Sequence, residues 1–230
     1  MATLYRQGAH GRGDERANAD EPNGSPHRSA EAVAVTGVAD RVGAEDHLAT
    51  ELVRSWLRVL VSPRRFFRER VVPRDQAPGL LFAMGVVLVA ETTRVAFVPG
   101  ASNAGSPLFD VVRILAAVLF VTPAALHVLA ALQTVLLIPL APDRAGISET
   151  VQVLAYAAAP CALTGVPIVE VRALAGLYAA ALLTIGLSEV HRISLGRSVL
   201  VGAVPAFLGY GLGFRAFDAI TALLARWYII

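Results

Sequence analysis

Lysine is absent from this chain of 230 residues, and cysteine occurs once, at Cys161. A single cysteine excludes a disulfide or a multi-cysteine metal site within one chain. Charge is also scarce: 17% of the residues are charged, against about 25% in ordinary soluble domains. Hydrophobic residues make up 55%, and the mean hydropathy is +0.58. This composition argues against a soluble enzyme and favours a membrane protein.

The few charges are unevenly placed along the chain. Residues 1–75 hold 23 charged residues, whereas residues 76–230 hold 15. Residues 1–48 are polar, show no apolar periodicity and contain one aromatic residue, Tyr5, so they bury too little surface to offset the entropy of ordering. We therefore expect a disordered polar tail over 1–48, a basic interfacial segment over 50–75 and a membrane domain over 76–230.

The basic segment has the pattern of an amphipathic helix followed by a second short helix. Ser62 and Pro63 supply an N-cap and a first-turn proline for the second helix. In the first helix the apolar side chains recur on one face, namely Leu52, Val53, Trp56, Leu57 and Leu60. The arginines of the segment are Arg54, Arg58, Arg64, Arg65, Arg68, Arg70 and Arg74. This pattern predicts binding to the headgroups of anionic lipids. The alternative is that the segment packs on the protein's own helices as a collar.

From residue 76 the chain consists of apolar runs separated by short polar stretches. A helix needs about 20 residues to cross the roughly 30 Å core of a bilayer, and the expected spans are 77–98, 111–140, 149–168, 172–188 and 198–222. The sequence therefore predicts an all-α, polytopic integral membrane bundle of about five transmembrane helices. After residue 214 the chain either completes its span or turns along the interface.

Three of the expected spans contain proline: Pro123, Pro160 and Pro205. Each proline frees the carbonyl four residues earlier, so a kink and a substitute hydrogen-bond donor are expected at each site. The donors must come from neighbouring helices or from water. These positions therefore mark close helix packing or a small polar cavity.

Arginines near the span ends predict the orientation. If the N-terminus lies in the cytoplasm, that side holds ten arginines from residue 51 onwards and the opposite side holds at most five. Five spans then place the C-terminus outside the cell, and the location is the cell membrane.

Ionisable residues occur in the spans as three pairs of opposite charge at a spacing of three: Glu91 with Arg94, Asp110 with Arg113, and Arg215 with Asp218. This spacing puts the members of each pair on one helical face. All three pairs are expected near the same membrane surface, where they could form one polar cluster. Mutual neutralisation near the interface is one interpretation; an ion or solute pathway is the other.

The chain contains none of the common catalytic or nucleotide-binding motifs, such as GxSxG, HExxH or a P-loop. His127 and Gln133 suit hydrogen bonds between helices. Glu189 and His191, two residues apart, point to different helical faces and are a weak metal site. We therefore expect no catalytic residues, no metal, no cofactor and no nucleic-acid partner.

Several short motifs stand out in the spans and the loop between them: Tyr156 and Pro160 in the third span, Tyr178 in the fourth, and the loop motif containing Gly186, Leu187, Glu189, His191 and Ser194. The basic segment adds Trp56, Pro63, Phe66 and Phe67. In these features, residues 52–210 resemble the Yip1-domain family in its prokaryotic form. The resemblance implies five spans and a cytoplasmic N-terminus, and in eukaryotic members it implies interaction with small GTPases during vesicle traffic.

Two functions remain open at this point. The first is a non-catalytic membrane scaffold that organises lipid or partner proteins, with homo- or hetero-oligomers forming through helix contacts. The second is a small transporter or channel that uses the intramembrane Glu/Asp–Arg pairs. A hydrated cavity that reaches Glu91 or His127 would favour the transporter, and a dry bundle would favour the scaffold.

Overall fold

The computed structural model describes residue 47 and residues 49–102 and 106–227, so nearly all of the predicted tail lies outside the described residues. The described part is helical and contains no strand. Four helices are long and apolar enough to cross a membrane: Ala77–Phe97, Pro107–Leu137, Val169–His191 and Leu195–Gly213. The predicted all-α membrane bundle is confirmed.

Two of these spans are longer than expected. The second begins at Pro107 rather than 111, because Ser106 caps it by accepting a hydrogen bond from the Phe109 N–H. It consists of α4 (Pro107–Ala116), the π-helical turn η1 (Ala117–Val121) and α5 (Thr122–Leu137). The fourth expected span, 172–188, is the longer helix α7 (Val169–His191).

The third expected span, 149–168, is not one long helix. It consists of α6 (Ile147–Ala157) and the 3-10 segment η2 (Ala159–Gly165). Pro160 accounts for the break, because it has no N–H to donate and its ring clashes with the carbonyl of the preceding turn. Residues 150–157 are all buried, so this pass lies inside the bundle.

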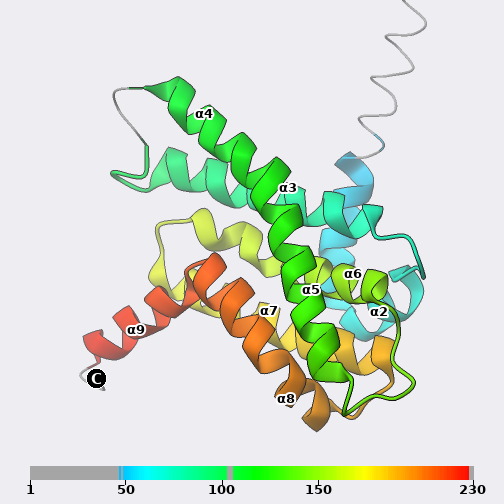
Figure 1. The fold of residues 1–230 in the computed structure, drawn as a ribbon. Coiled ribbons are helices and arrows are strands. Elements are labelled where there is room, and N and C mark those ends of the chain that lie inside the picture. Colours follow the sequence, from blue (N-terminus) through cyan, green and yellow to red (C-terminus); the bar gives the residue numbers. More distant parts are fainter. Residues whose placement is uncertain (1–46, 48, 103–105, 228–230) are drawn as a thin grey trace, which may run out of the picture. The chain divides into compact units, whose positions relative to one another are not determined.

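Together α6 and η2 still run the length of α3 (Ala77–Phe97). Gly79, in the first turn of α3, lies against Gln152 of α6, and Gly165, at the end of η2, lies against Ala90 and Arg94 near the end of α3. The chain therefore makes five passes, along α3, α4–α5, α6–η2, α7 and the last pair of segments described below (Figure 1). The middle pass is the one enclosed by the others.

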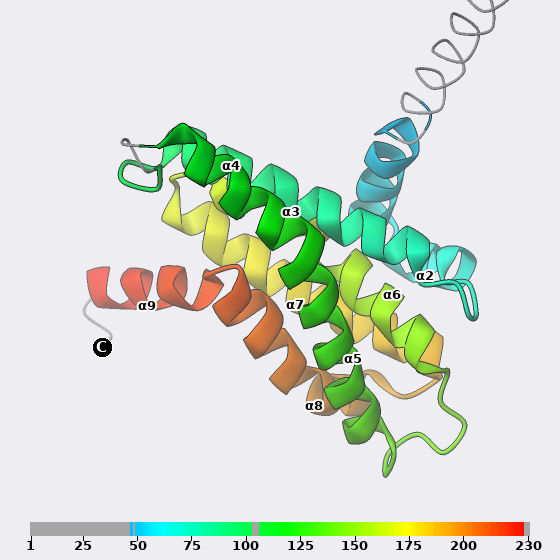
Figure 2. The same cartoon turned by 45° about the horizontal axis from the view of Figure 1, so that its top comes forward.

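The fifth expected span, 198–222, is interrupted at Arg215. α8 (Leu195–Ala206) and the π-helical segment η3 (Phe207–Gly213) form the span, and Arg215 then has a positive φ of 59°. The chain turns there, so α9 (Ala216–Arg226) runs at an angle to α8 (Figure 2). α9 is amphipathic and packs on α7, where Ala216 lies against Gly176. Residues 216–226 thus form a separate helix rather than the end of the span.

The prolines act as expected on the neighbouring hydrogen bonds. Ahead of Pro123 the helix widens into η1, and both the N–H and the hydroxyl of Thr122 bond to the Ala117 carbonyl. Pro205 frees the carbonyl of Val201, and Gln133 Nε2 of α5 donates to that oxygen at 3.2 Å. A polar side chain from one pass therefore satisfies a proline-freed carbonyl in another.

Replacement of Gly165 by alanine should destabilise the bundle. A Cβ at this position would lie 2.2 Å from the Ala90 carbonyl oxygen, so η2 would have to move away from α3 at a cost of about 1–3 kcal/mol. The midpoint of thermal unfolding in detergent measures the loss. Gly196→Ala is the matched control, because a Cβ there meets nothing within 4 Å; equal midpoints for the two variants would contradict the close approach.

Candidate functional site

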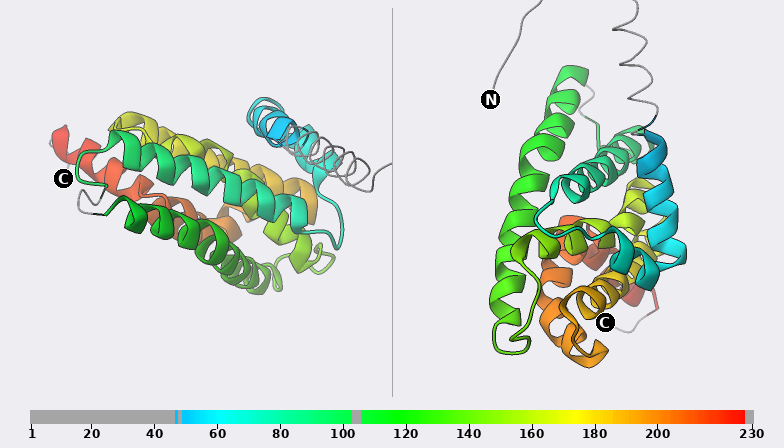
Figure 3. Two further views of the ribbon diagram at one scale, coloured as in Figure 1. Left: turned by 90° about the horizontal axis from the view of Figure 1, so that it is seen from above. Right: turned by 90° about the vertical axis from the view of Figure 1, so that its right-hand side faces the viewer.

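The basic segment is docked on the bundle. It consists of a helix over residues 49–61 and α2 (Pro63–Arg70). In the right-hand view of Figure 3, the helix over residues 49–61 and the long α4–α5 helix lie on opposite sides of the bundle. Val59, Phe66 and Phe67 are buried in the common core. The collar that the sequence left as an alternative is therefore the arrangement present in the structure.

Three contacts fix the segment to distant parts of the chain. Trp56 Nε1 donates to the Ala159 carbonyl in η2 at 2.7 Å. The hydroxyl of Tyr178 in α7 donates to the Leu60 carbonyl. Other contacts are aromatic: the rings of Phe66 and Tyr156 meet edge to face with centroids 4.9 Å apart. The segment is thus tied to both α6–η2 and α7.

Glu189 connects α7 to α2 by two ion pairs. Its carboxylate lies 2.6 Å from Arg68 Nε and 3.2 Å from Arg64 Nη1. The side chain of Glu189 is only 9% exposed, so the two arginines cover it. Its hydrogen bond and negative charge raise the pKa of Arg68 above its usual value. The ion pairs of Glu189 therefore hold α2 on α7 in addition to the apolar contacts of Phe66 and Phe67.

The outward face of the segment differs from the predicted one. Val53 and Leu57 were expected to share a face with Trp56, but both are exposed, as is Val61. The face of this helix that packs on the bundle is narrower than the apolar face predicted from the sequence. It is centred on Val59, with Leu52, Trp56 and Leu60 beside it.

The outward face also carries much of the positive charge of the segment. Arg54, Arg58, Arg65 and Arg74 are exposed, and Arg54 and Arg65 form ion pairs with Glu51 and Glu69 of the segment itself. Arg70 lies 3.7 Å from the same Glu51 carboxylate. In the described part of the chain, Arg58 and Arg74 have no ion pair.

His191 points away from Glu189 and into the core. It is buried, and its Nε2 lies 3.4 Å from the hydroxyl of Thr150 in α6. The structure thus separates the two residues that could have formed a metal site. Within the described ranges, no three His, Cys, Asp or Glu side chains lie close enough to hold a metal ion.

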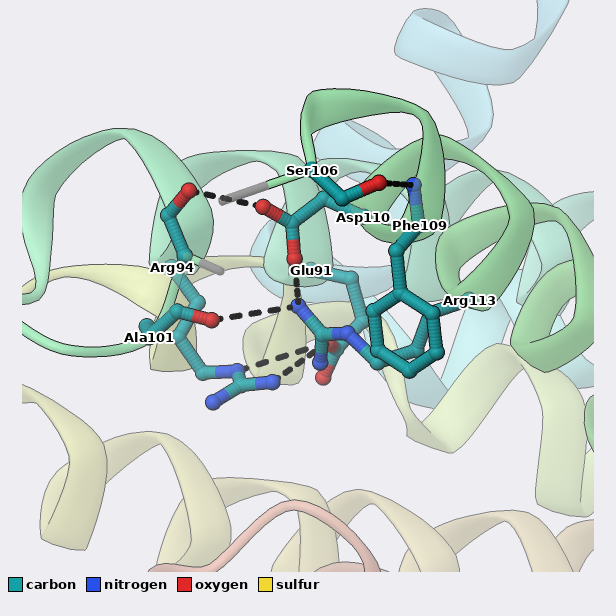
Figure 4. Close-up of polar contacts among 8 residues, drawn as sticks. Glu91, Arg94, Ala101, Ser106, Phe109, Asp110 and Arg113 are labelled. Carbon is teal, nitrogen blue, oxygen red and sulfur yellow. Dashed lines mark hydrogen bonds and ion pairs between the residues drawn. The ribbon is translucent and has the colours of Figure 1, made fainter. Parts of the chain in front are cut away.

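Two of the three predicted ion pairs come together at the other end of the bundle. Glu91 Oε2 lies 2.9 Å from Arg94 Nη2 on α3 and 3.3 Å from Arg113 Nη1 on α4 (Figure 4). Arg113 also lies 3.5 Å from Asp110, and Asp110 accepts a hydrogen bond from Ser102 at 2.7 Å. Two acidic and two basic side chains therefore neutralise one another where α3 and α4 meet.

The third predicted pair is not part of this polar cluster. Arg215 and Asp218 are both exposed, and neither forms an ion pair with any residue that the structure describes. The chain turns at Arg215, and α9 then packs along α7, whereas the polar cluster lies on α3 and α4. The predicted single cluster of six residues is thus reduced to four.

A cavity of about 930 Å³ lies between α3, η1–α5, η2 and η3. Its wall is mostly apolar, and both π-helical segments border it, for example through Phe120 of η1 and Gly209 of η3. Four ionisable residues border it as well: Glu91, Arg94, Arg172 and Arg215. His127 does not border it and instead bonds to the Pro123 carbonyl through Nδ1.

The sequence predicted close helix packing or a small polar cavity at the prolines, whereas this cavity is large and mostly apolar. Sequence reasoning did not predict that Arg172 borders it. Arg172 follows Glu170 by two residues in the first turn of α7, a spacing that puts the two side chains on different helical faces, so no spacing pattern links Arg172 to the residues around the cavity. Pro123 and Pro205 were the available signal, since both sit beside the π-helical segments that border the cavity. π-helical turns often occur at functional sites.

Comparison with known proteins assigns the chain to a family. The profile of the Yip1 domain matches residues 57–215, which is more than half of the chain. No curated protein and no solved structure matches the chain significantly.

Removal of the Glu189 carboxylate should loosen the basic segment. Glu189→Ala leaves Arg64 and Arg68 without their shared partner. If the two ion pairs together stabilise the docked state of the segment by about 1 kcal/mol, the undocked state becomes about fivefold more populated. The rate of tryptic cleavage after Arg64, Arg65 and Arg68 in detergent should then rise about fivefold. Glu69→Ala is the control, because Glu69 binds only the exposed Arg65 within α2. Equal cleavage rates in the two variants would show that Glu189 does not hold the segment.

Removal of Glu91 should destabilise the polar cluster. Arg94 and Arg113 both lose a carboxylate in Glu91→Ala, and hydrogen bonds to charged groups are each worth about 2 kcal/mol. The yield of folded protein in the membrane should fall, and adding Arg94→Ala should restore part of it. Asp218→Ala, which removes an exposed carboxylate, should leave the yield unchanged. Normal yield for Glu91→Ala would contradict a structural role for the cluster.

Proposed function

Because the chain belongs to the Yip1-domain family, we propose that this integral membrane protein is a non-catalytic scaffold in the cell membrane. It would organise lipid or partner proteins through contacts made by its surface. The N-terminus would face the cytoplasm and the C-terminus the outside. The distribution of arginines supports this orientation, since the side assigned to the cytoplasm holds ten of the arginines from residue 51 onwards and the opposite side holds five.

The observation that carries the proposal is the two-sided basic segment. One face is fixed to the bundle through Trp56, Phe66 and Glu189. The other face presents exposed apolar and basic side chains next to each other, including Leu57 and Arg58. A helix held rigidly in this way loses little further conformational freedom when it binds, which favours association. The exposed face therefore suits an anionic membrane surface or an acidic partner protein.

The state of the intramembrane charges also supports a scaffold. Glu91 is held between two arginines, and Asp110 is held by Ser102 and Arg113. Groups that neutralise one another in this way stabilise helix packing, and these four side chains offer no unpaired charge to a permeating ion.

One observation favours the alternative of a small transporter or channel. The cavity of about 930 Å³ reaches Glu91 and Arg94, as a solute pathway would require. A flux of anions into vesicles containing the purified protein, lost in Arg172→Gln, would support this alternative.

A photoreactive residue in place of Leu57 should form a discrete protein adduct in native membranes, because Leu57 lies on the exposed face. Arg54→Gln combined with Arg58→Gln should reduce that adduct, since these arginines flank the same face. Gel shifts and mass spectrometry of the crosslinked product measure both effects.

The control is the same photoreactive residue at Trp56, which faces the bundle and should crosslink only within the chain. Adducts that are identical at the two positions, or that do not respond to the arginine substitutions, would count against the scaffold. Lipid adducts alone at Leu57 would restrict the proposal to organisation of lipid.

A further inference from the structure

The cavity between α3, η1–α5, η2 and η3 has a charged end and an apolar remainder. Arg94, Arg172 and Arg215 come from the end of α3, the first turn of α7 and the start of α9. Glu91 is the one acidic residue that borders the cavity. The lining residues therefore carry an excess of positive charge at this end.

Two of these arginines have no carboxylate partner among the residues that the structure describes. Arg94 shares Glu91 with Arg113. In the part of the chain that the structure describes, Arg172 and Arg215 form no ion pair. Two unpaired guanidinium groups beside an apolar wall favour a ligand with a negatively charged group, and arginine binds phosphate oxygens particularly well.

The cavity is long, counting its charged end. Along α3 and its C-cap it extends from Ala83 to Val98, which is about 22 Å at 1.5 Å per residue. Half of a bilayer core is about 15 Å thick. The cavity is therefore long enough for a headgroup region followed by an acyl chain within one leaflet.

The cavity opens at membrane depth. Phe120 and Val128 border it, and their side chains are 72% and 67% exposed. Both lie well inside the 31-residue helix Pro107–Leu137. A ligand can therefore enter sideways from the hydrocarbon region, which a soluble anion does not cross.

From this geometry we infer that the cavity binds one anionic phospholipid. The phosphate lies among Arg94, Arg172 and Arg215, and an acyl chain occupies the wall formed by α3, η1–α5 and η3. The lipid belongs to the leaflet opposite the docked basic segment, because these arginines lie at the other end of α3 from α2.

The volume of the cavity, about 930 Å³, is that of a small-molecule site. Ligand pockets of roughly 300–1,000 Å³ are typical of small molecules. The inference goes beyond the proposed scaffold, since the lipid can bind whether or not partner proteins are recruited.

The test uses the purified full-length chain, delipidated in detergent, with dioleoylphosphatidylglycerol or dioleoylphosphatidylcholine as the probe. The two lipids share their acyl chains and differ in net charge. Native mass spectrometry should show one bound phosphatidylglycerol per chain and weaker binding of phosphatidylcholine. Each arginine near a lipid surface contributes about fivefold to binding, so Arg172→Gln with Arg215→Gln should weaken binding of phosphatidylglycerol about 30-fold.

Matched controls separate charge recognition from apolar contact. Arg192→Gln with Arg197→Gln removes two exposed arginines at the opposite end of the bundle and should leave binding unchanged. Ala125→Trp fills the cavity and should reduce binding of both lipids, whereas Ala131→Trp, on an exposed position of α5 outside the cavity, should not.

Several results would overturn the inference. These are equal binding of the two lipids to the wild-type chain, equal losses in the two arginine pairs, displacement of the lipid by soluble glycerol phosphate, and a dimer of the chain in place of the lipid adduct. The wild-type preference between lipids tests the inference even if a variant does not fold. Because no partner protein is present, failure here is distinct from failure of the crosslinking experiment on the scaffold.

Discussion

The bundle depends on the burial of its middle pass. A helix broken by proline leaves backbone carbonyls without partners, and such groups cannot face lipid. The α6–η2 pass contains this break at Pro160, and it lies inside the bundle with α3, α5 and α7 packed around it. Gly165 allows the backbones of η2 and α3 to approach closely. The remaining passes can then present their apolar side chains to the membrane.

The docked basic segment follows from the same middle pass. Tyr156 and Ala159 belong to α6–η2, and they contact Phe66 and Trp56 of the segment. The segment therefore completes the core at one end rather than resting on a finished bundle. The amphipathic pattern of the segment follows from this position: the buried face closes the core, and the opposite face carries exposed arginines such as Arg58.

Sequence patterns predicted the class, the long apolar helices α3, α4–α5 and α7, and two ion pairs, because each of these depends on residues close together in the chain. Glu91 and Arg94, for example, are three residues apart and share a helical face. The pattern could not separate Val53 and Leu57 from Trp56, since the burial of a helical face depends on the neighbour it meets. The ion pairs of Glu189 with Arg64 and Arg68 join residues more than 120 positions apart, and no local spacing encodes such a contact.

The cavity arises where two proline-altered helices face each other. Pro123 follows η1 and Pro205 precedes η3, and both π-helical segments border the cavity. A π-helical turn inserts an extra residue and displaces the helix surface. The displaced surfaces leave space that small side chains, such as Ala125 and Gly209, do not fill. Because the turn at Arg215 follows η3 directly, the same departure from regular helix that creates the space also brings Arg215 to the charged end of the cavity.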